Sequence, residues 1–128
     1  MTRSPIAAVM IHVPDWHTGL EWYQQAFPEA MIVEVPEENW KCLEVGGISI
    51  ELVNADEKVP SGAAGTVVYW CTQHFDARLD YLLSLGAQLF RGPIRIEGDC
   101  RICQVKDPFG NPIGIREVND RERDDTNT

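Results

Sequence analysis

Basic residues are scarce in this sequence, and their scarcity limits its partners. The 128 residues include 11 Lys and Arg against 20 Asp and Glu, which gives a formal net charge of −9 at pH 7. Nucleic acids and anionic membrane surfaces are bound through basic patches, so we expect neither as a partner. A small-molecule ligand that is neutral or cationic, such as an aromatic cation, fits this charge better.

Long apolar runs are also absent. No stretch reaches the roughly 18 apolar residues that cross a bilayer. The N-terminus has no basic region followed by an apolar segment, as a secretory signal would have. We therefore expect a cytoplasmic protein with no membrane segment.

Cysteines are few, and their spacing does not indicate disulfides or a metal site. The four residues are Cys42, Cys71, Cys100 and Cys103, and a domain of this size does not need a disulfide framework. Cys100 and Cys103 match the C-x-x-C pattern, but a structural zinc would need a second pair or nearby histidines. In a strand-like run these two side chains would point to opposite faces. We interpret all four as packing residues.

The same order of secondary-structure elements is predicted twice along the chain. Apolar periodicity predicts a strand, a helix and three further strands in the first half, at 6–13, 15–27, 30–35, 39–45 and 48–53. The same order is predicted in the second half, at 66–72, 76–85, 87–91, 101–106 and 112–118. The segment between the halves, 54–64, carries Pro, Ser, Gly and charge without periodicity and predicts a linker. A repeated unit is therefore the organising feature of the chain.

The repeat predicts one α+β domain over residues 1–128. It consists of a βαβββ module at 5–53 and a second module at 65–118, joined by the linker 54–64. A polar tail at 119–128 is expected to be disordered. Each module has a sheet with an apolar face, and two such sheets hide these faces by curling toward each other. The expected result is an open, eight-stranded, barrel-like cleft.

Three segments in this order resemble the vicinal oxygen chelate superfamily, which includes glyoxalase I, bleomycin and fosfomycin resistance proteins and extradiol dioxygenases. The segments are HVPDWHTGLEWYQQAF, GISIELV and VKDPFGNPIGI. The resemblance implies paired βαβββ modules around a ligand or metal site, and a homodimer. In glyoxalase-like members, four side chains hold a divalent metal, one from the first and one from the last strand of each module.

The resemblance places the four metal positions at Ala8, Glu51, Thr66 and Gly114. Glu51 matches, but Ala and Gly have no donor atom in their side chains and Thr is a poor ligand. One carboxylate does not hold a catalytic metal in water. We therefore expect no metal and no cofactor, which argues against metal-dependent glyoxalase or dioxygenase chemistry.

Alternation along the strands predicts which side chains face the cleft. We take Glu51 as a candidate catalytic base and His12 as a candidate acid. Four further residues are predicted to bind the ligand: Met10, Trp70, Gln104 and Arg116. On the fifth strand, the count puts Trp70 on the face of Gly114. The segment 91–100 is long enough to form a lid over the pocket.

The same side chains also have purely structural interpretations. His12 could be a hydrogen-bonded histidine at a strand end. Glu51 could form a structural ion pair with Arg116 or His12. Trp70 could belong to the core, where aromatic residues are common.

These observations favour a metal-free protein that binds a small organic molecule, for example by sequestering a drug or antibiotic. The alternative is an enzyme. It would be a glyoxalase-type lyase or isomerase or a dioxygenase with an atypical metal set, or a metal-free acid–base catalyst that uses Glu51 and His12. The fold does not decide between the two, because one superfamily hosts many chemistries.

Overall fold

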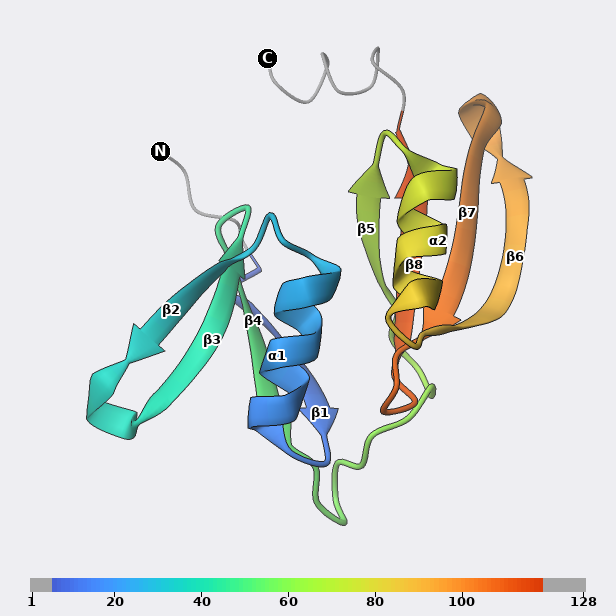
Figure 1. The fold of residues 1–128 in the computed structure, drawn as a ribbon. Coiled ribbons are helices and arrows are strands. Elements are labelled where there is room, and N and C mark those ends of the chain that lie inside the picture. The colour runs from blue at the N-terminus through green and yellow to red at the C-terminus, as the bar shows by residue number, and fades with distance from the viewer. Residues whose placement is uncertain (1–5, 119–128) are drawn as a thin grey trace. The chain divides into compact units, whose positions relative to one another are not determined.

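The computed structural model describes residues 6–118, which form two compact units that divide between Ser61 and Gly62 (Figure 1). The division falls within the predicted linker. Each unit has one four-stranded sheet and one α-helix. Neither of these helices is long and apolar enough to cross a membrane. The tail predicted at 119–128 lies outside the described residues.

The first unit forms a sheet in which the first and last strands lie side by side. Its elements are β1 (Ala8–Val13), α1 (Trp16–Ala26), β2 (Met31–Val35), the 3-10 turn η1 (Pro36–Glu38), β3 (Trp40–Val45) and β4 (Ile48–Asn54). The strand order is β1-β4-β3-β2. β1 runs parallel to β4, and the other neighbours are antiparallel.

The second unit repeats this arrangement. Its elements are β5 (Val68–Thr72), α2 (Phe75–Ser84), β6 (Gln88–Ile96), the 3-10 turn η2 (Glu97–Asp99), β7 (Cys100–Lys106) and β8 (Pro112–Glu117). The strand order is β5-β8-β7-β6, with β5 parallel to β8. The predicted fold class, α+β built from two βαβββ modules, is confirmed, and each module forms an open sheet of its own.

α1 covers one face of its sheet because its apolar residues recur at the helical period. Leu20 and Tyr23 are buried on the helix, and Leu43 and Leu52 on the strands below it are fully buried. Burial of this stripe is the main force that holds the helix on the sheet. The opposite, helix-free face of the sheet has no such apolar requirement.

The start of α1 is fixed by a side-chain cap and by a close approach to β1. Asp15 accepts hydrogen bonds from the backbone N–H and the hydroxyl of Thr18, at 3.1 and 2.8 Å. These bonds lower the pKa of Asp15. A Cβ at Gly19 would lie 2.8 Å from a methyl carbon of Val13, so only glycine lets the helix pack this closely against the strand.

α2 is anchored by charges instead of a side-chain cap. Its N-cap residue, His74, makes no side-chain capping hydrogen bond. Arg101 on β7 donates to Asp76 in the first turn and to Glu117 on β8, at 2.9 and 3.1 Å, and its guanidinium lies 4.6 Å from the centre of the Phe75 ring. The hydrogen bonds from Arg101 lower the pKa of Glu117. The face that carries Arg101 and Glu117 is therefore the face that α2 covers.

The segment 91–100, predicted as a lid, is mostly strand. β6 continues to Ile96 and pairs with β7 as far as Cys100, and Glu97–Asp99 forms a tight turn. The register shifts between Leu89 and Arg91 and again between Arg91 and Ile94. Bulges of this kind accommodate Gly and Pro inside a strand. The lid prediction is wrong, because backbone hydrogen bonds to β7 fix this segment in the sheet.

Candidate functional site

The helix-free face of the second sheet carries a row of residues that crosses all four strands. The register pairs Tyr69 on β5 with Gly114 on β8. It pairs Gln104 on β7 with Gly114 on one side and with Arg91 on β6 on the other. Paired residues on neighbouring strands point to the same face. The row is therefore Tyr69–Gly114–Gln104–Arg91.

Gly114 makes room for the ring of Tyr69. A Cβ built on Gly114 would lie 2.5–2.7 Å from three ring carbons of Tyr69, far closer than van der Waals contact allows. The hydroxyl of Tyr69 accepts a hydrogen bond from Gln104 Nε2 at 2.9 Å. A glycine at the centre of an apolar strand, which costs stability by itself, is explained by the aromatic ring that lies over it.

The metal position predicted at Thr66 and the face predicted for Trp70 are both wrong by one residue. Thr66 precedes β5, and Trp70 pairs with Ile115, which is buried on the face that α2 covers. A shift of one residue moves every side chain of a strand to the opposite face. The aromatic residue beside Gly114 is therefore Tyr69, not Trp70.

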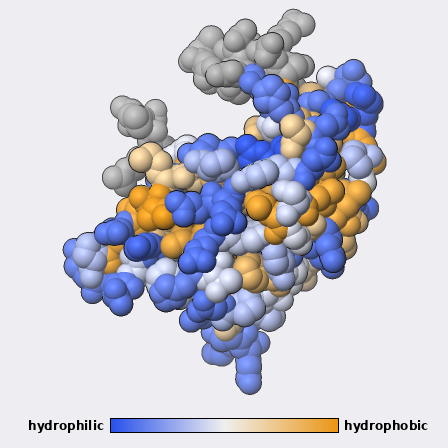
Figure 2. Space-filling view, in the orientation of Figure 1, coloured by the Kyte–Doolittle hydropathy of each residue, from blue (hydrophilic) through white to orange (hydrophobic). Residues whose placement is uncertain are grey.

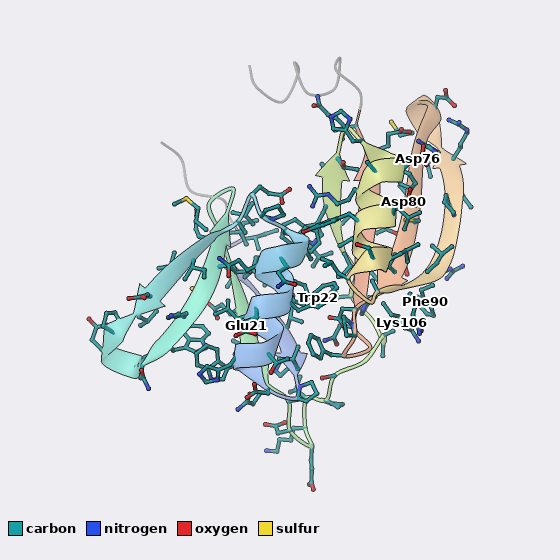
Figure 3. The ribbon with its side chains drawn as sticks, in the orientation of Figure 1. Glu21, Trp22, Asp76, Asp80, Phe90 and Lys106 are labelled. Carbon is teal, nitrogen blue, oxygen red and sulfur yellow. The ribbon has the colours of Figure 1, made fainter. Side chains whose placement is uncertain are left out.

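Two arginine side chains on this helix-free face have no carboxylate partner among the described residues. Arg91 ends the row, and Arg116 lies one pleat further along β8. Both are exposed, and neither forms an ion pair with a described residue. Lys106 shares the face, and its ammonium lies 4.4 Å from the centre of the Phe90 ring (Figure 3). The described strand residues of this face include no acid, so its electrostatic potential favours anions.

A pocket of about 250 Å³ opens at the row. The residues that line it are Tyr69, Arg91, Gly92, Ile94, Ile102, Cys103 and Gln104. Convergent polar groups beside aliphatic side chains are the usual composition of a small-molecule site. Burial raises the pKa of the Cys103 thiol, which disfavours the thiolate and hence a nucleophilic role.

The two units correspond position by position. Met10 stands five residues before the N-cap of α1, and Tyr69 stands five residues before the N-cap of α2. The register pairs Met10 with Glu51 as it pairs Tyr69 with Gly114. Glu51 and Gly114 therefore occupy equivalent positions, and the acidic side chain of the first unit has no counterpart in the second.

Three predicted site residues share the helix-free face of the first sheet. Met10 and His12 are alternate residues of β1, and Glu51 lies beside Met10 on β4. Glu51 accepts a hydrogen bond from the hydroxyl of Ser49 at 3.0 Å. Met10 is 54% exposed, so it offers an apolar contact surface.

The six predicted site residues are thus divided among three faces. Met10, His12 and Glu51 lie together on the first sheet. Gln104 lines the pocket of the second sheet, and Arg116 shares its face. The remaining residue, Trp70, is on the opposite side of that sheet.

The residues at the four metal positions do not fit a divalent metal. The counterpart of Ala8, two residues before Met10, is Val67, two residues before Tyr69. Ala8, Val67 and Gly114 offer no side-chain donor atom, which leaves the carboxylate of Glu51 alone. Within residues 6–118, as far as their side chains are described, no group of three or more His, Cys, Asp or Glu is placed to hold a metal ion.

Sequence reasoning missed Tyr69 and Arg91 as site residues. The segment TVVYWCT is apolar throughout, so its periodicity does not distinguish its two faces. Spacing from the helix cap, compared between the two modules, would have placed Tyr69 correctly. Arg91 falls in the segment 91–100, which is predicted as a lid because of its length, although Gly92 and Pro93 lie at bulges within β6.

Solved structures share this fold along nearly their whole length. A glyoxalase/bleomycin resistance protein/dioxygenase family enzyme from Burkholderia phytofirmans PsJN is 20% identical, with a TM-score of 0.71 over 90% of this chain and 99% of that chain. The fosfomycin resistance protein FosX from Listeria monocytogenes is 16% identical, with a TM-score of 0.74 over 95% and 99%. A glyoxalase/bleomycin resistance protein/dioxygenase superfamily member from Sphaerobacter thermophilus DSM 20745 is 17% identical, with a TM-score of 0.69 over 90% and 98%.

These similarities define the class of fold. A scan against protein-family models and a search of curated proteins give no match. At these identities, the structural similarity establishes the fold alone. The chain has the fold of the glyoxalase/bleomycin resistance/dioxygenase proteins, and the resemblance to the vicinal oxygen chelate superfamily is confirmed at that level.

Proposed function

We propose that this protein binds a small organic anion, without a divalent metal, at the helix-free face of its second unit. The observation that carries the proposal is the row Tyr69–Gly114–Gln104–Arg91. Where the resemblance places a metal-binding carboxylate, the row has a glycine covered by a tyrosine ring. At its end the row has a guanidinium with no ion-pair partner among the described residues, and this group supplies both charge and a planar fork of N–H donors. An anion bound there needs no metal.

The charge around the pocket of the second unit favours an anionic ligand, whereas the net charge of the whole chain suggests a neutral or cationic one. The first 61 residues contain ten acidic and three basic residues, whereas residues 62–118 contain six of each. A cationic ligand in the second unit would meet Arg91 and Arg116, and no described strand residue of this face carries a carboxylate to offset them. An anionic group on a compact apolar body fits the guanidinium and the two isoleucines that line the pocket.

Sequestration of an antibiotic or another toxic molecule is the biological role that we propose for this binding. It is supported by the fold neighbours, which include a fosfomycin resistance protein and a glyoxalase/bleomycin resistance protein. The pocket volume of about 250 Å³ is slightly below the usual range for small-molecule sites, so a compact ligand is expected. The homodimer and the cytoplasmic location stay predictions.

Fragment screening by NMR tests the ligand class. Phenylphosphonate, benzyl alcohol and phenyltrimethylammonium present the same ring with a negative, neutral or positive group. We expect phenylphosphonate alone to shift the amide resonances of Gly92 and Gln104. Equal shifts with the cation, or no shift with phenylphosphonate, would overturn the proposal.

Two arginines on the same strand provide a matched pair of variants. Arg91 lines the pocket, whereas Arg95 forms an ion pair with Asp99 at 3.0 Å. Arg91→Gln and Arg95→Gln change the net charge equally. We expect Arg91→Gln to weaken phenylphosphonate binding at least about tenfold, which corresponds to one charge-assisted hydrogen bond, and Arg95→Gln to leave it unchanged. Equal weakening would mean that only the overall charge matters.

Catalysis by Glu51 and His12 stays a second prediction. It is supported by the position of both side chains on the helix-free face of two neighbouring strands, β1 and β4. If they act on a ligand, Glu51→Gln should change ligand turnover or binding more than it changes the free energy of unfolding. Equal loss of both would show that Glu51 has a structural role only.

A further inference from the structure

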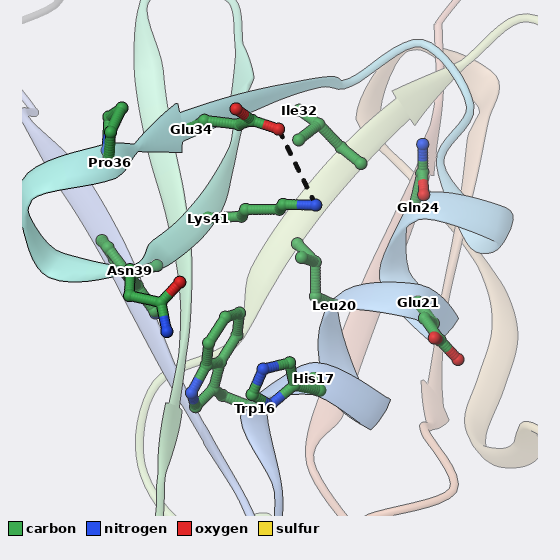
Figure 4. Close-up of a pocket in the computed structure, with 11 residues that line it drawn as sticks. Trp16, His17, Leu20, Glu21, Gln24, Ile32, Glu34, Pro36, Asn39 and Lys41 are labelled. Carbon is green, nitrogen blue, oxygen red and sulfur yellow. Dashed lines mark ion pairs between the residues drawn. The ribbon is translucent and has the colours of Figure 1, made fainter.

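A cavity of the first unit lies on the side of its sheet that faces α1, away from Met10, His12 and Glu51. It is a groove of about 710 Å³ between α1 and the hairpin formed by β2 and β3 (Figure 4). That volume is within the range of small-molecule sites. Ile32 on its β2 side is exposed, and hydrophobic side chains gather over this end of the first unit on the face that Figure 2 shows. None of the residues assigned to the proposed anion site lines this groove.

One end of the groove is a wall of aromatic rings. The Trp16 ring stacks on the His17 ring, with centroids 3.7 Å apart and planes 26° apart. The Trp40 ring meets Trp16 edge to face, with centroids 6.3 Å apart. The backbone N–H of Trp16 donates to the side chain of Asn54 at 2.8 Å, which ties this corner to the end of β4. The wall is therefore held in place without a ligand.

The charges that line the groove leave one carboxylate unpaired. Lys41 reaches across the hairpin to Glu34, with Nζ and Oε1 3.8 Å apart (Figure 4). Glu21, on the α1 side, has no ion-pair partner among the described residues. The surrounding first unit is strongly acidic, with ten acidic and three basic residues in its first 61. The field in the groove therefore favours a cation.

We infer that this groove binds a flat organic cation, with its ring against Trp16 and Trp40 and its charge near Glu21. Aromatic faces attract cations through the ring quadrupole, and tryptophan does so most strongly. Glu21 lies about one and a half turns along α1 from Trp16, and its carboxylate, which has no ion-pair partner among the described residues, adds to this attraction. The two units then bind ligands of opposite charge, an organic cation at the first and an organic anion at the second.

Calorimetric titration of the full chain with 1-methylquinolinium tests this inference. The matched neutral probe is 1-methyl-2-quinolone, which has the same ring size without the charge. We expect the cation to bind at least tenfold more tightly than the neutral probe, and more weakly as the salt concentration rises. Equal affinities would overturn the inference, because they would show that the groove selects only apolar surface.

Four substitutions locate the site. Glu21→Gln and Glu57→Gln remove the same charge, but Glu57 does not line the groove. We expect a loss of about threefold for Glu21→Gln and none for Glu57→Gln. Trp40→Leu should weaken cation binding about fivefold, and Trp40→Phe, which keeps an aromatic face, should weaken it less. A thermal melt confirms that each variant is folded.

Two further results would contradict the inference. The first is unchanged cation affinity in folded Glu21→Gln and Trp40→Leu. The second is occupation of the groove by another copy of the chain, seen as a dimer in sedimentation that Trp40→Leu converts to monomer. Phenylphosphonate binding by these variants is measured in parallel. A failure at this groove is then distinguishable from a failure at the anion site, where Arg91→Gln is the diagnostic variant.

Discussion

The two units have the same order of elements and the same register, yet equivalent positions on their helix-free faces differ in kind. Met10 beside Glu51 in the first unit corresponds to Tyr69 beside Gly114 in the second. The first pair leaves a half-buried carboxylate that is held by a neighbouring hydroxyl. The second pair has no carboxylate, and the aromatic ring of Tyr69 lies over Gly114 instead.

The helix-facing sides of the sheets differ much less. Leu43, Ile50 and Leu52 under α1 correspond to apolar strand residues such as Val105 and Ile115 in the second unit. These positions must be apolar to bury the helix, so both units keep them. The helix-free faces carry no such requirement. Their differences are therefore the better guide to function.

The largest difference between the units should appear at the equivalent positions Gly114 and Glu51. We expect Gly114→Ala to destabilise the protein by roughly 1–3 kcal/mol, because the new Cβ overlaps the Tyr69 ring and the ring must move. Glu51→Ala should cost at most about 1 kcal/mol, since it removes one hydrogen bond from a half-buried group. Urea denaturation measures both.

The Tyr69→Ala background shows whether the ring is the cause. With the ring absent, Gly114→Ala should cost little, so the two substitutions should be strongly non-additive. An unchanged cost in that background would mean that the backbone of β8, and not Tyr69, requires the glycine.

The helix caps should show the next largest difference. Asp15→Ala removes the hydrogen bonds to Thr18 and should cost about 1 kcal/mol. His74→Ala at the equivalent position of α2 should stay within about 0.5 kcal/mol, because His74 makes no side-chain cap. Thermal or urea unfolding of the two variants measures the contrast. Equal losses of stability in the two variants would contradict the conclusion that a side-chain cap anchors α1 but not α2.

The smallest effect is a pH dependence of the second unit. Hydrogen bonds from Arg101 hold the pKa of Glu117 below its ordinary value of 4.5. Folding therefore favours the ionised carboxylate, and this stability is complete above about pH 4.5 and is lost as the pH falls through the lower, folded-state pKa. We expect the wild-type protein to lose its stability advantage over Glu117→Gln as the pH falls in that window. A difference that is constant with pH would contradict this.

The fold was predictable from the sequence because its signals are local and occur twice. Leu20 and Tyr23 recur at helical spacing, Asp15 supplies a cap, and Asp107 to Asn111 is a dense turn signal before β8. The faces of a strand were predictable only where apolar and polar residues alternate. In β4 the alternation of Ile50 and Leu52 with Glu51 places Glu51 on the helix-free face, where the structure has it.

The rest of the site could not be predicted, for physical reasons that concern β5 and β6. β5 is apolar on both faces, so a shift of one residue leaves its hydrophobic pattern almost unchanged and exchanges Tyr69 with Trp70. Gly92 and Pro93 of β6 are residues typical of loops, so the local sequence predicts a loop there. Only pairing with β7 keeps them in the sheet. The unpaired state of Arg91 is a property of the folded face and has no signal in the sequence.

The most direct test of the central claim is the metal dependence of anion binding. Phenylphosphonate is titrated into protein purified without a metal-binding tag, once with EDTA and once with excess Mn²⁺. We expect the same dissociation constant in both conditions, because Arg91, Gln104 and Tyr69 supply the site. Binding that disappears in EDTA and returns with Mn²⁺ would contradict it.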